Sequence, residues 1–247
     1  MIRSLSPATF AALTSMAIAA ALSGCASSGS TPGAASTPAP AAAAAPAPAA
    51  APTKAAAAVD PKLPVAEFFN AKGAVAPFTL FLGTPANFST TVPQNGMGAL
   101  DAGAIKVEPT KVGDEPGAKF TWTGGLGQFH IQSKVANDML DYLDANSAMV
   151  FDAVVHKAPE DQVTMRVDCR YPCLGVVDMT NYFKHAPLNQ KVQIKMPLSC
   201  FEATGTKFTA VNTPLVVFTT KAFGLSVANV RYVPGAAKDA DALKCTP

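Results

Sequence analysis

The chain has 247 residues, of which 49% are hydrophobic, and its formal net charge is only +2. A nucleic-acid-binding protein needs a clear basic excess to displace counterions from phosphates, so this charge balance argues against that class. No apolar run reaches the ~20 residues that a mature transmembrane helix requires, which argues against a polytopic membrane protein.

The N-terminus has the pattern of a bacterial export signal, with Arg3 ahead of an apolar stretch from Ala8 to Leu22. The stretch ends in Leu22-Ser23-Gly24-Cys25, which resembles the lipobox of bacterial lipoproteins. The resemblance implies a signal peptide over residues 1–24, cut before a lipidated Cys25. Ala26 follows the cysteine, and in the Gram-negative sorting pattern this favours the outer membrane, on its periplasmic face or at the cell surface. The alternative is an ordinary cleavable signal with a chance cysteine.

Residues 25–61 are rich in alanine and proline and contain Ala-Pro repeats such as Pro38-Ala39-Pro40. Prolines at this density interrupt helices, and the small side chains offer almost nothing to bury. We expect a disordered or polyproline-II-like tether, which spans on the order of 100 Å when fully extended.

Residues 62–247 change to short apolar or alternating runs separated by Gly, Pro and Asn, as is typical of an all-β sandwich. Two short helices are expected, over 136–143 and 179–185. The expected strands are 78–82, 104–107, 119–123, 128–132, 148–156, 162–168, 191–196, 215–219 and 224–232.

Several segments of this domain, in order, resemble the ExoP-type galactose-binding-like domain, a jelly-roll β-sandwich at the C-terminus of family-three exo-β-glucanases. The most specific are the Cys-x₃-Cys loop at Cys169–Cys173 and the run Pro197–Phe201, and the resemblance covers roughly 77–233. Phe88 stands where the family usually has tryptophan. The matching segments are 81–83, 87–88, 120–125, 127–128, 149–152, 165–173, 177–179, 196–201 and 228–231.

The family's catalytic portion lies upstream of this module, where this chain has the expected signal and tether. The resemblance therefore implies a non-catalytic module that binds a glycan of the β-glucan or galactoside kind, anchored in the cell envelope. Nucleophile-elbow, zinc-protease and phosphate-loop motifs are absent from the sequence, and no cofactor is expected. Gly124-Gly125-Leu126-Gly127 is predicted to be a hairpin loop. Two alternatives remain open: an envelope protein that docks another protein, and a small glycoside hydrolase.

Four cysteines remain after Cys25, an even number in an exported protein, and this favours two disulfides. Three pairings are formally possible. We predict Cys169–Cys173, which closes a short loop around Pro172, and then Cys200–Cys245. The competing interpretation is a metal site, but the Cys-x₃-Cys spacing and only three histidines argue against it.

A sugar-binding surface needs an aromatic face for stacking and planar polar groups for the hydroxyls. Trp122 and Tyr171 are the stacking candidates, although Trp122 shares strand parity with Phe120 and core packing is at least as probable. Polar side chains alternate with apolar ones on the strands that follow, and a solvated face with weak ion pairs is the plain alternative. The predicted polar residues are Gln128, His130, Asp152, Arg166 and Asp168.

Overall fold

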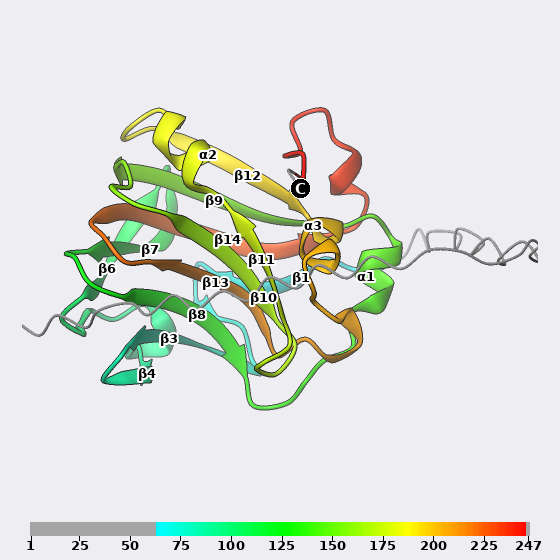
Figure 1. Cartoon of the computed structure of the whole chain (residues 1–247), viewed down its shortest axis with the longest axis horizontal. Helices are drawn as coiled ribbons and strands as arrows, with labels where there is room; N and C mark the ends of the chain where they lie inside the picture. Colours follow the sequence, from blue (N-terminus) through cyan, green and yellow to red (C-terminus); the bar gives the residue numbers. More distant parts are fainter. Residues whose placement is uncertain (1–62, 246–247) are drawn as a thin grey trace, which may run out of the picture. The chain divides into compact units, whose positions relative to one another are not determined.

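The computed structural model describes residues 63–245, which fold into two β-sheets packed face to face (Figure 1). All pairings between the strands are antiparallel. The helices of this part of the chain are short, and none is long and apolar enough to cross a membrane. They are α1 (Leu140–Asp144), α2 (Thr180–His185) and α3 (Leu198–Ala203), with the 3₁₀ turns η1 (Gln94–Gly96), η2 (Phe208–Ala210) and η3 (Ala236–Lys238).

The larger sheet has eight strands in the order β12-β9-β14-β7-β6-β5, and β1 joins it through β14 and β2 through β1. Its strands are β1 (Ala66–Asn70), β2 (Gly73–Ala74), β5 (Leu100–Asp101), β6 (Ile105–Val112), β7 (Glu115–Trp122), β9 (Ala148–Lys157), β12 (Lys191–Pro197) and β14 (Phe223–Val233). The smaller sheet has six strands in the order β11-β10-β13-β8-β3-β4. They are β3 (Phe78–Thr84), β4 (Asn87–Thr91), β8 (Gly127–Ser133), β10 (Val163–Asp168), β11 (Leu174–Asp178) and β13 (Thr213–Thr219).

All nine predicted strands are present, and the prediction of an all-β jelly-roll sandwich is confirmed. The prediction missed five strands, β1, β2, β4, β5 and β11, which are short or lie at sheet edges, and it missed α3. The helix expected over 136–143 begins only at Leu140, while α2 agrees with the expectation to within one residue.

The core lies between the two sheets and takes one side-chain parity from most strands. On β9, for example, Met149, Phe151 and Ala153 face inward and are fully buried. Phe120 of β7 stacks on Phe129 of β8 across the sandwich, with ring centroids 3.8 Å apart. The opposite parity of each strand therefore forms the two outer faces, where a ligand can bind.

The glycine-rich segment Gly124–Gly127 is not a hairpin loop, so that prediction is wrong. It connects β7 of the larger sheet to β8 of the smaller sheet, and these two strands do not pair. Gly124 and Gly125 have φ values of +123° and +85°, a region that favours glycine. Gly124 and Gly125 therefore allow the chain to turn sharply from one sheet to the other.

The outer face of the larger sheet is partly covered by the chain itself. Val112, at the end of β6, packs on Val154 and Ala228 of this face and is completely buried. Ala236 of η3 packs on Ala148 and Val150 farther along β9. The outer face of the smaller sheet also has buried residues in its middle, among them His130 and Val216, but it carries aromatic and charged side chains together.

Candidate functional site on the outer face of the smaller sheet

Strand register brings polar and aromatic side chains into two rows on the outer face of the smaller sheet. Leu82, Phe129 and Met165 point into the core, so the residues that alternate with them point outward. Cross-strand pairing makes the first row Phe81, His130, Val216, Arg166 and Val176. The second row is Gly83, Gln128, Phe218, Thr164 and Asp178.

Arg166 and Asp168 form an ion pair on this face, two residues apart on β10. Nη2 of Arg166 donates to Oδ2 of Asp168 at 3.0 Å, and their side chains are 23% and 13% exposed. Among residues 63–245, Arg166 Nε and Asp168 Oδ1 are two of three buried side-chain polar atoms that have no hydrogen-bond partner. Burial raises the pKa of Asp168, although Arg166 opposes this. One donor and one acceptor of this ion pair thus have no hydrogen-bond partner, and both atoms are buried.

His130 lies in the same row as Arg166, with Val216 of β13 between them, and is 4% exposed. Its burial, together with the positive charge of Arg166, lowers the pKa of His130 to about 4. Gln128 Nε2 lies 3.3 Å from His130 Nδ1. An amide nitrogen can only donate, so Nδ1 accepts and the neutral ring is the form that fits this contact. The ring of Phe81 lies parallel to the imidazole, with centroids 5.3 Å apart.

The sequence argument did not identify Phe81 or Phe218 as members of this face. Both are half-buried, and each alternates with core residues on its strand. Because both are apolar like their inward-facing neighbours, hydrophobicity alone could not show that their side chains point outward. Phe88 of β4 is 48% exposed at the edge of the same sheet.

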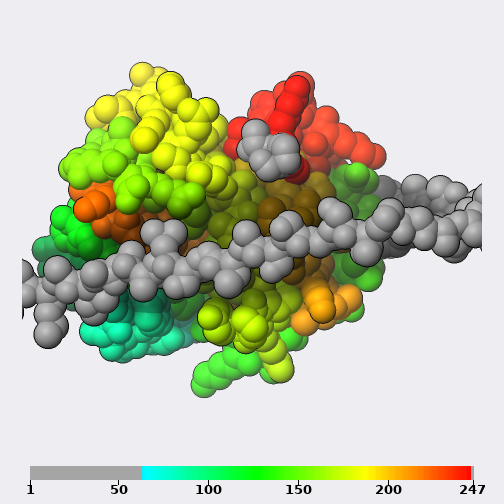
Figure 2. Space-filling view, viewed as in Figure 1, coloured from blue at the N-terminus to red at the C-terminus, as the bar shows by residue number. Residues whose placement is uncertain are grey.

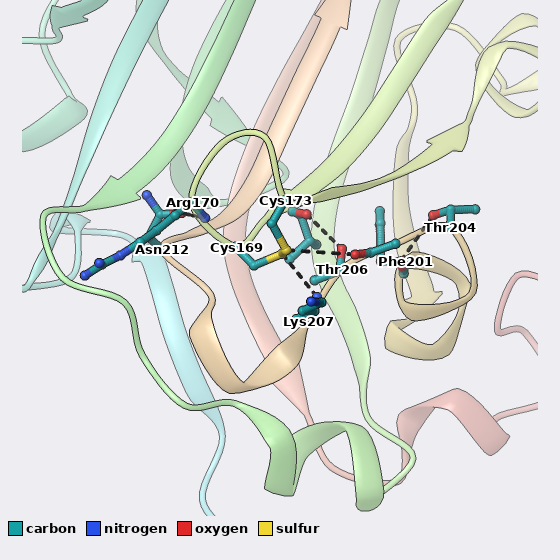
Figure 3. The surroundings of a disulfide bond; sticks show 10 residues. Cys169, Arg170, Cys173, Phe201, Thr204, Thr206, Lys207 and Asn212 are labelled. Atoms are coloured by element: carbon teal, nitrogen blue, oxygen red, sulfur yellow. Dashed lines mark hydrogen bonds between the residues drawn. A yellow bond between two sulfur atoms is a disulfide. The ribbon is translucent and has the colours of Figure 1, made fainter.

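Tyr171 is 84% exposed and lies between Cys169 and Cys173 in the sequence. The disulfide between these two cysteines closes a short loop (Figure 3). The backbone N–H of Arg170 donates to Asn212 Oδ1 at 2.8 Å, which fixes the loop against the segment before β13. The loop backbone is therefore anchored, and Tyr171 is an exposed aromatic close in sequence to Asp168.

Trp122 is a core residue, so its selection as a stacking platform is wrong and the core alternative is correct. It is 1% exposed, its Nε1 donates to the Gly127 carbonyl at 2.8 Å, and it packs near Phe223 and Phe129. Its side chain faces inward on β7 and has no surface to offer a ligand.

Asp152 does not lie with the other polar residues, so the prediction of a single polar patch is wrong for Asp152. It lies on β9 in the larger sheet, while His130, Arg166 and Asp168 lie in the smaller one. Its carboxylate accepts hydrogen bonds from Gln193 and Asn229 and pairs with Lys191. Burial would raise the pKa of Asp152, but these partners outweigh it and lower the pKa. Asp152 thus has hydrogen-bond and ion-pair partners within the protein, and its role is structural.

A Ser–His–Asn arrangement occurs on the larger sheet. His156 Nε2 lies 2.7 Å from Ser226 Oγ, and His156 Nδ1 lies 3.1 Å from Asn189 Oδ1. The same order of groups activates serine in hydrolases. Ser226, however, is 0% exposed, so a substrate cannot reach its hydroxyl. The contacts join β9 to β14 and do not form an active site.

Both predicted disulfides are present, Cys169–Cys173 and Cys200–Cys245. The first is further held by the N–H of Lys207, which lies 3.1 Å from Cys169 Sγ (Figure 3). Within residues 63–245, no three or more His, Cys, Asp or Glu side chains are grouped so as to hold a metal ion. The predicted signal, tether and Cys25 lie outside the described residues.

Comparisons with known proteins identify a family model and solved structures that are similar to this chain. A family model described as galactose-binding domain-like, Exop_C, matches residues 76–232. The exo-1,3/1,4-β-glucanase of a Pseudoalteromonas species has a TM-score of 0.60 at 14% identity over 74% of this chain, which spans only 22% of that enzyme. That enzyme's extra C-terminal domain alone has a TM-score of 0.59 at 14% identity, over 74% of this chain and 99% of the domain.

The family 30 carbohydrate-binding module of cellulosomal cellulase Cel9D-Cel44B of Clostridium thermocellum is also similar in fold. It has a TM-score of 0.51 at 15% identity, over 70% of this chain and 99% of the module. No curated protein matches the sequence. The family model covers more than half of the chain, and the chain therefore belongs to the Exop_C family of galactose-binding domain-like modules.

Proposed function

We propose that this protein is a non-catalytic module that binds a neutral glycan on the outer face of the six-stranded sheet. The observation that carries the proposal is the unused pair on β10, Arg166 Nε and Asp168 Oδ1, both buried and without a partner. A buried polar group without a partner costs stability, so a binding partner that satisfies it gains that free energy.

A sugar hydroxyl matches this pair because it accepts and donates hydrogen bonds at the same oxygen. Both atoms are covered in the free protein, so the neighbouring side chains must move aside when a sugar binds. Arg166 Nε–H then donates to the hydroxyl oxygen, and the hydroxyl hydrogen is donated to Asp168 Oδ1. Hydrogen bonds to charged groups are stronger than neutral ones. The charges of Arg166 and Asp168 cancel, which favours a neutral glycan over an anionic one.

Aromatic side chains supply the other element of sugar recognition, an apolar surface for the face of a sugar ring. Phe81 and Phe218 lie on strands of the same outer face, and Tyr171 stands exposed at the end of β10. Aromatic rings bury large areas at a ligand and hold it in a defined orientation. Gln128 and Gln132 add amide groups beside them.

The comparisons support the choice of probe. The structurally similar Pseudoalteromonas enzyme is an exo-1,3/1,4-β-glucanase, and the Clostridium domain is a family 30 carbohydrate-binding module. We therefore choose mixed-linkage β-glucan oligosaccharides as the first ligands to test.

We further propose that the protein is exported and lipid-anchored through Cys25 after removal of residues 1–24, with the outer membrane as its site. The support is the Leu22-Ser23-Gly24-Cys25 sequence after an apolar stretch. Lipid chains bind a membrane by burying CH₂ groups at ~0.8 kcal/mol each. Residues 25–61 then serve as the tether that carries the module away from the surface.

A glycan array probed with the full chain tests the binding proposal. We expect signals on neutral β-glucans, and we expect Arg166→Ala to remove them. Arg231→Ala on the larger sheet is a matched control that keeps them. Silence across β-glucans, galactosides and peptidoglycan fragments would contradict the proposal and favour the protein-docking alternative.

A further inference from the structure

A cavity of about 270 Å³ lies at the β11 end of the six-stranded sheet. Three of its lining residues, Thr164, Val176 and Asp178, belong to the outer face described above, and Val176 pairs directly with Arg166. Thr204 and Cys245 line it from outside the sheet. The cavity is therefore continuous with the face on which we propose that a glycan binds.

The wall of this cavity is firmly attached to the sheet. The N–H of Val176 donates to Thr204 Oγ1 at 2.9 Å, which ties the end of α3 to the free edge of β11. Cys200 of α3 is bonded to Cys245, so the last described residues, red in Figures 1 and 2, are joined to the same helix. Lys195 holds this segment a second time through Asp239 and Asp241, at 2.7 and 2.8 Å.

The opposite end of the same face has no such wall in the described part of the chain. β4 is the edge strand there, and four of its five residues, Asn87, Phe88, Ser89 and Thr91, are exposed. Neighbouring strands lie about 4.8 Å apart, so the face is about 24 Å long from β4 to β11. A chain that crosses the strands can extend past β4, whereas at β11 it meets α3 and the C-terminal segment.

We propose that the cavity beside β11 takes the terminal sugar of a glycan, so that the module binds chain ends and not internal segments. This inference rests on the proposed glycan-binding function. The cavity is smaller than the ~300–1,000 Å³ of a drug-sized pocket and fits one sugar ring better than a continuing chain.

The lining has the groups that a terminal sugar requires. The Thr164 hydroxyl, the Asp178 carboxylate and the Gln162 amide lie together, and Gln162 Nε2 donates to Asp178 Oδ2 at 3.0 Å. A terminal sugar has one free hydroxyl more than an internal one, where that oxygen carries the next sugar. We expect this additional hydroxyl to form hydrogen bonds with the polar groups of the cavity.

Binding stoichiometry on a polymer tests the inference with the unmodified full chain. The ligand is a 1,3/1,4-β-glucan of known mean chain length, titrated by calorimetry beside the corresponding tetrasaccharide. We expect one bound protein per chain end, and an affinity per end that equals that for the tetrasaccharide. Tetrasaccharides methylated at the non-reducing end or reduced to the alditol show which end is bound, and one of the two should bind at least about tenfold more weakly.

Val176→Trp fills the cavity and should weaken binding of the tetrasaccharide by about tenfold or more. Ser89→Trp places the same side chain at the open β4 end and should leave end binding in place. Many bound proteins per polymer chain, or equal binding of both blocked tetrasaccharides, would overturn the chain-end inference while leaving glycan binding intact. Absence of binding to polymer and tetrasaccharide alike would overturn both.

Discussion

Arg166 and Asp168 are joined by one hydrogen bond of 3.0 Å, yet each keeps a second buried polar atom that has no partner. A half-satisfied polar pair away from water is costly to a protein, and such sites are candidates for ligand binding. In the same row, His130 is held neutral and Phe81 lies nearly parallel to its ring. The fold alone gives no reason for these two unpartnered atoms, and we therefore place the ligand site at this pair.

Trp122→Ala should destabilise the domain without a direct effect on glycan binding. The side chain is 1% exposed and its Nε1 bonds to the Gly127 carbonyl, so its removal should cost about 3–5 kcal/mol. Urea unfolding measures this loss, and Trp122→Phe, which keeps most of the volume, should cost less. A fully stable Trp122→Ala variant would show that the residue is not in the core.

Stability should fall as the pH is lowered from about 6.5 to about 4 because of His130. The folded-state pKa of this ring is lowered to about 4, so in that range the unfolded chain binds a proton that the folded chain does not. The lowered pKa of His130 corresponds to a loss of roughly 3 kcal/mol in the free energy of unfolding across this range. Above pH 7 the ring is neutral in both states, so it causes no pH dependence there.

Thermal denaturation between pH 4 and 8 checks this prediction. His130→Gln keeps a planar neutral side chain and should flatten the curve relative to the native protein. The raised pKa of Asp168 contributes in the opposite direction, since its proton is bound more tightly in the folded state, but it is present in both proteins. Equal slopes in the two proteins would mean that His130 titrates normally.

The two disulfides should contribute unequally to stability. The Cys200–Cys245 bond spans 45 residues and the Cys169–Cys173 bond only four. The chain-entropy model assigns roughly 4 kcal/mol to the longer loop and about 2 kcal/mol to the shorter one. Double alanine variants of each pair, compared by urea unfolding, should show the larger loss for Cys200 and Cys245; the reverse order would contradict the model.

Cys25→Ser should release the protein from membranes and abolish its labelling by radioactive fatty acid. The thiol is the acceptor of lipid in the proposed pathway, and serine cannot replace it. Membrane fractionation of cells that express each form provides the measurement. An unlabelled native protein, together with a mutant that still fractionates with membranes, would argue against the anchor.

The strand positions were predictable because alternation and turn residues are local signals. Gln128 to Gln132 alternates cleanly in the sequence, and these residues lie on β8 with the predicted parity. The short edge strands β2 and β5, of two residues each, carry no such pattern and were missed. The Cys200–Cys245 bond was also predicted, since the local pair leaves only one partner for each remaining cysteine.

The site was predicted only in part because the assignment of strands to sheets depends on long-range pairing. His130, Arg166 and Asp168 were placed on one face correctly, whereas Asp152 has the same outward parity on the other sheet. Phe218 went unnoticed for a related reason, since an apolar residue on an outer face resembles a core residue in sequence. Register across β8, β13 and β10 is what brings these residues together.

Isothermal titration of the full chain with a 1,3/1,4-β-glucan tetrasaccharide tests the central claim most directly. Loss of a hydrogen bond to a charged group costs about 1.5–3 kcal/mol, so Arg166→Ala should weaken binding by roughly 10- to 100-fold. Arg231→Ala, the matched arginine on the larger sheet, should bind like the native protein. If the native protein binds and folded Arg166→Ala binds equally well, the Arg166–Asp168 pair is not the ligand site and the proposal for this face is wrong.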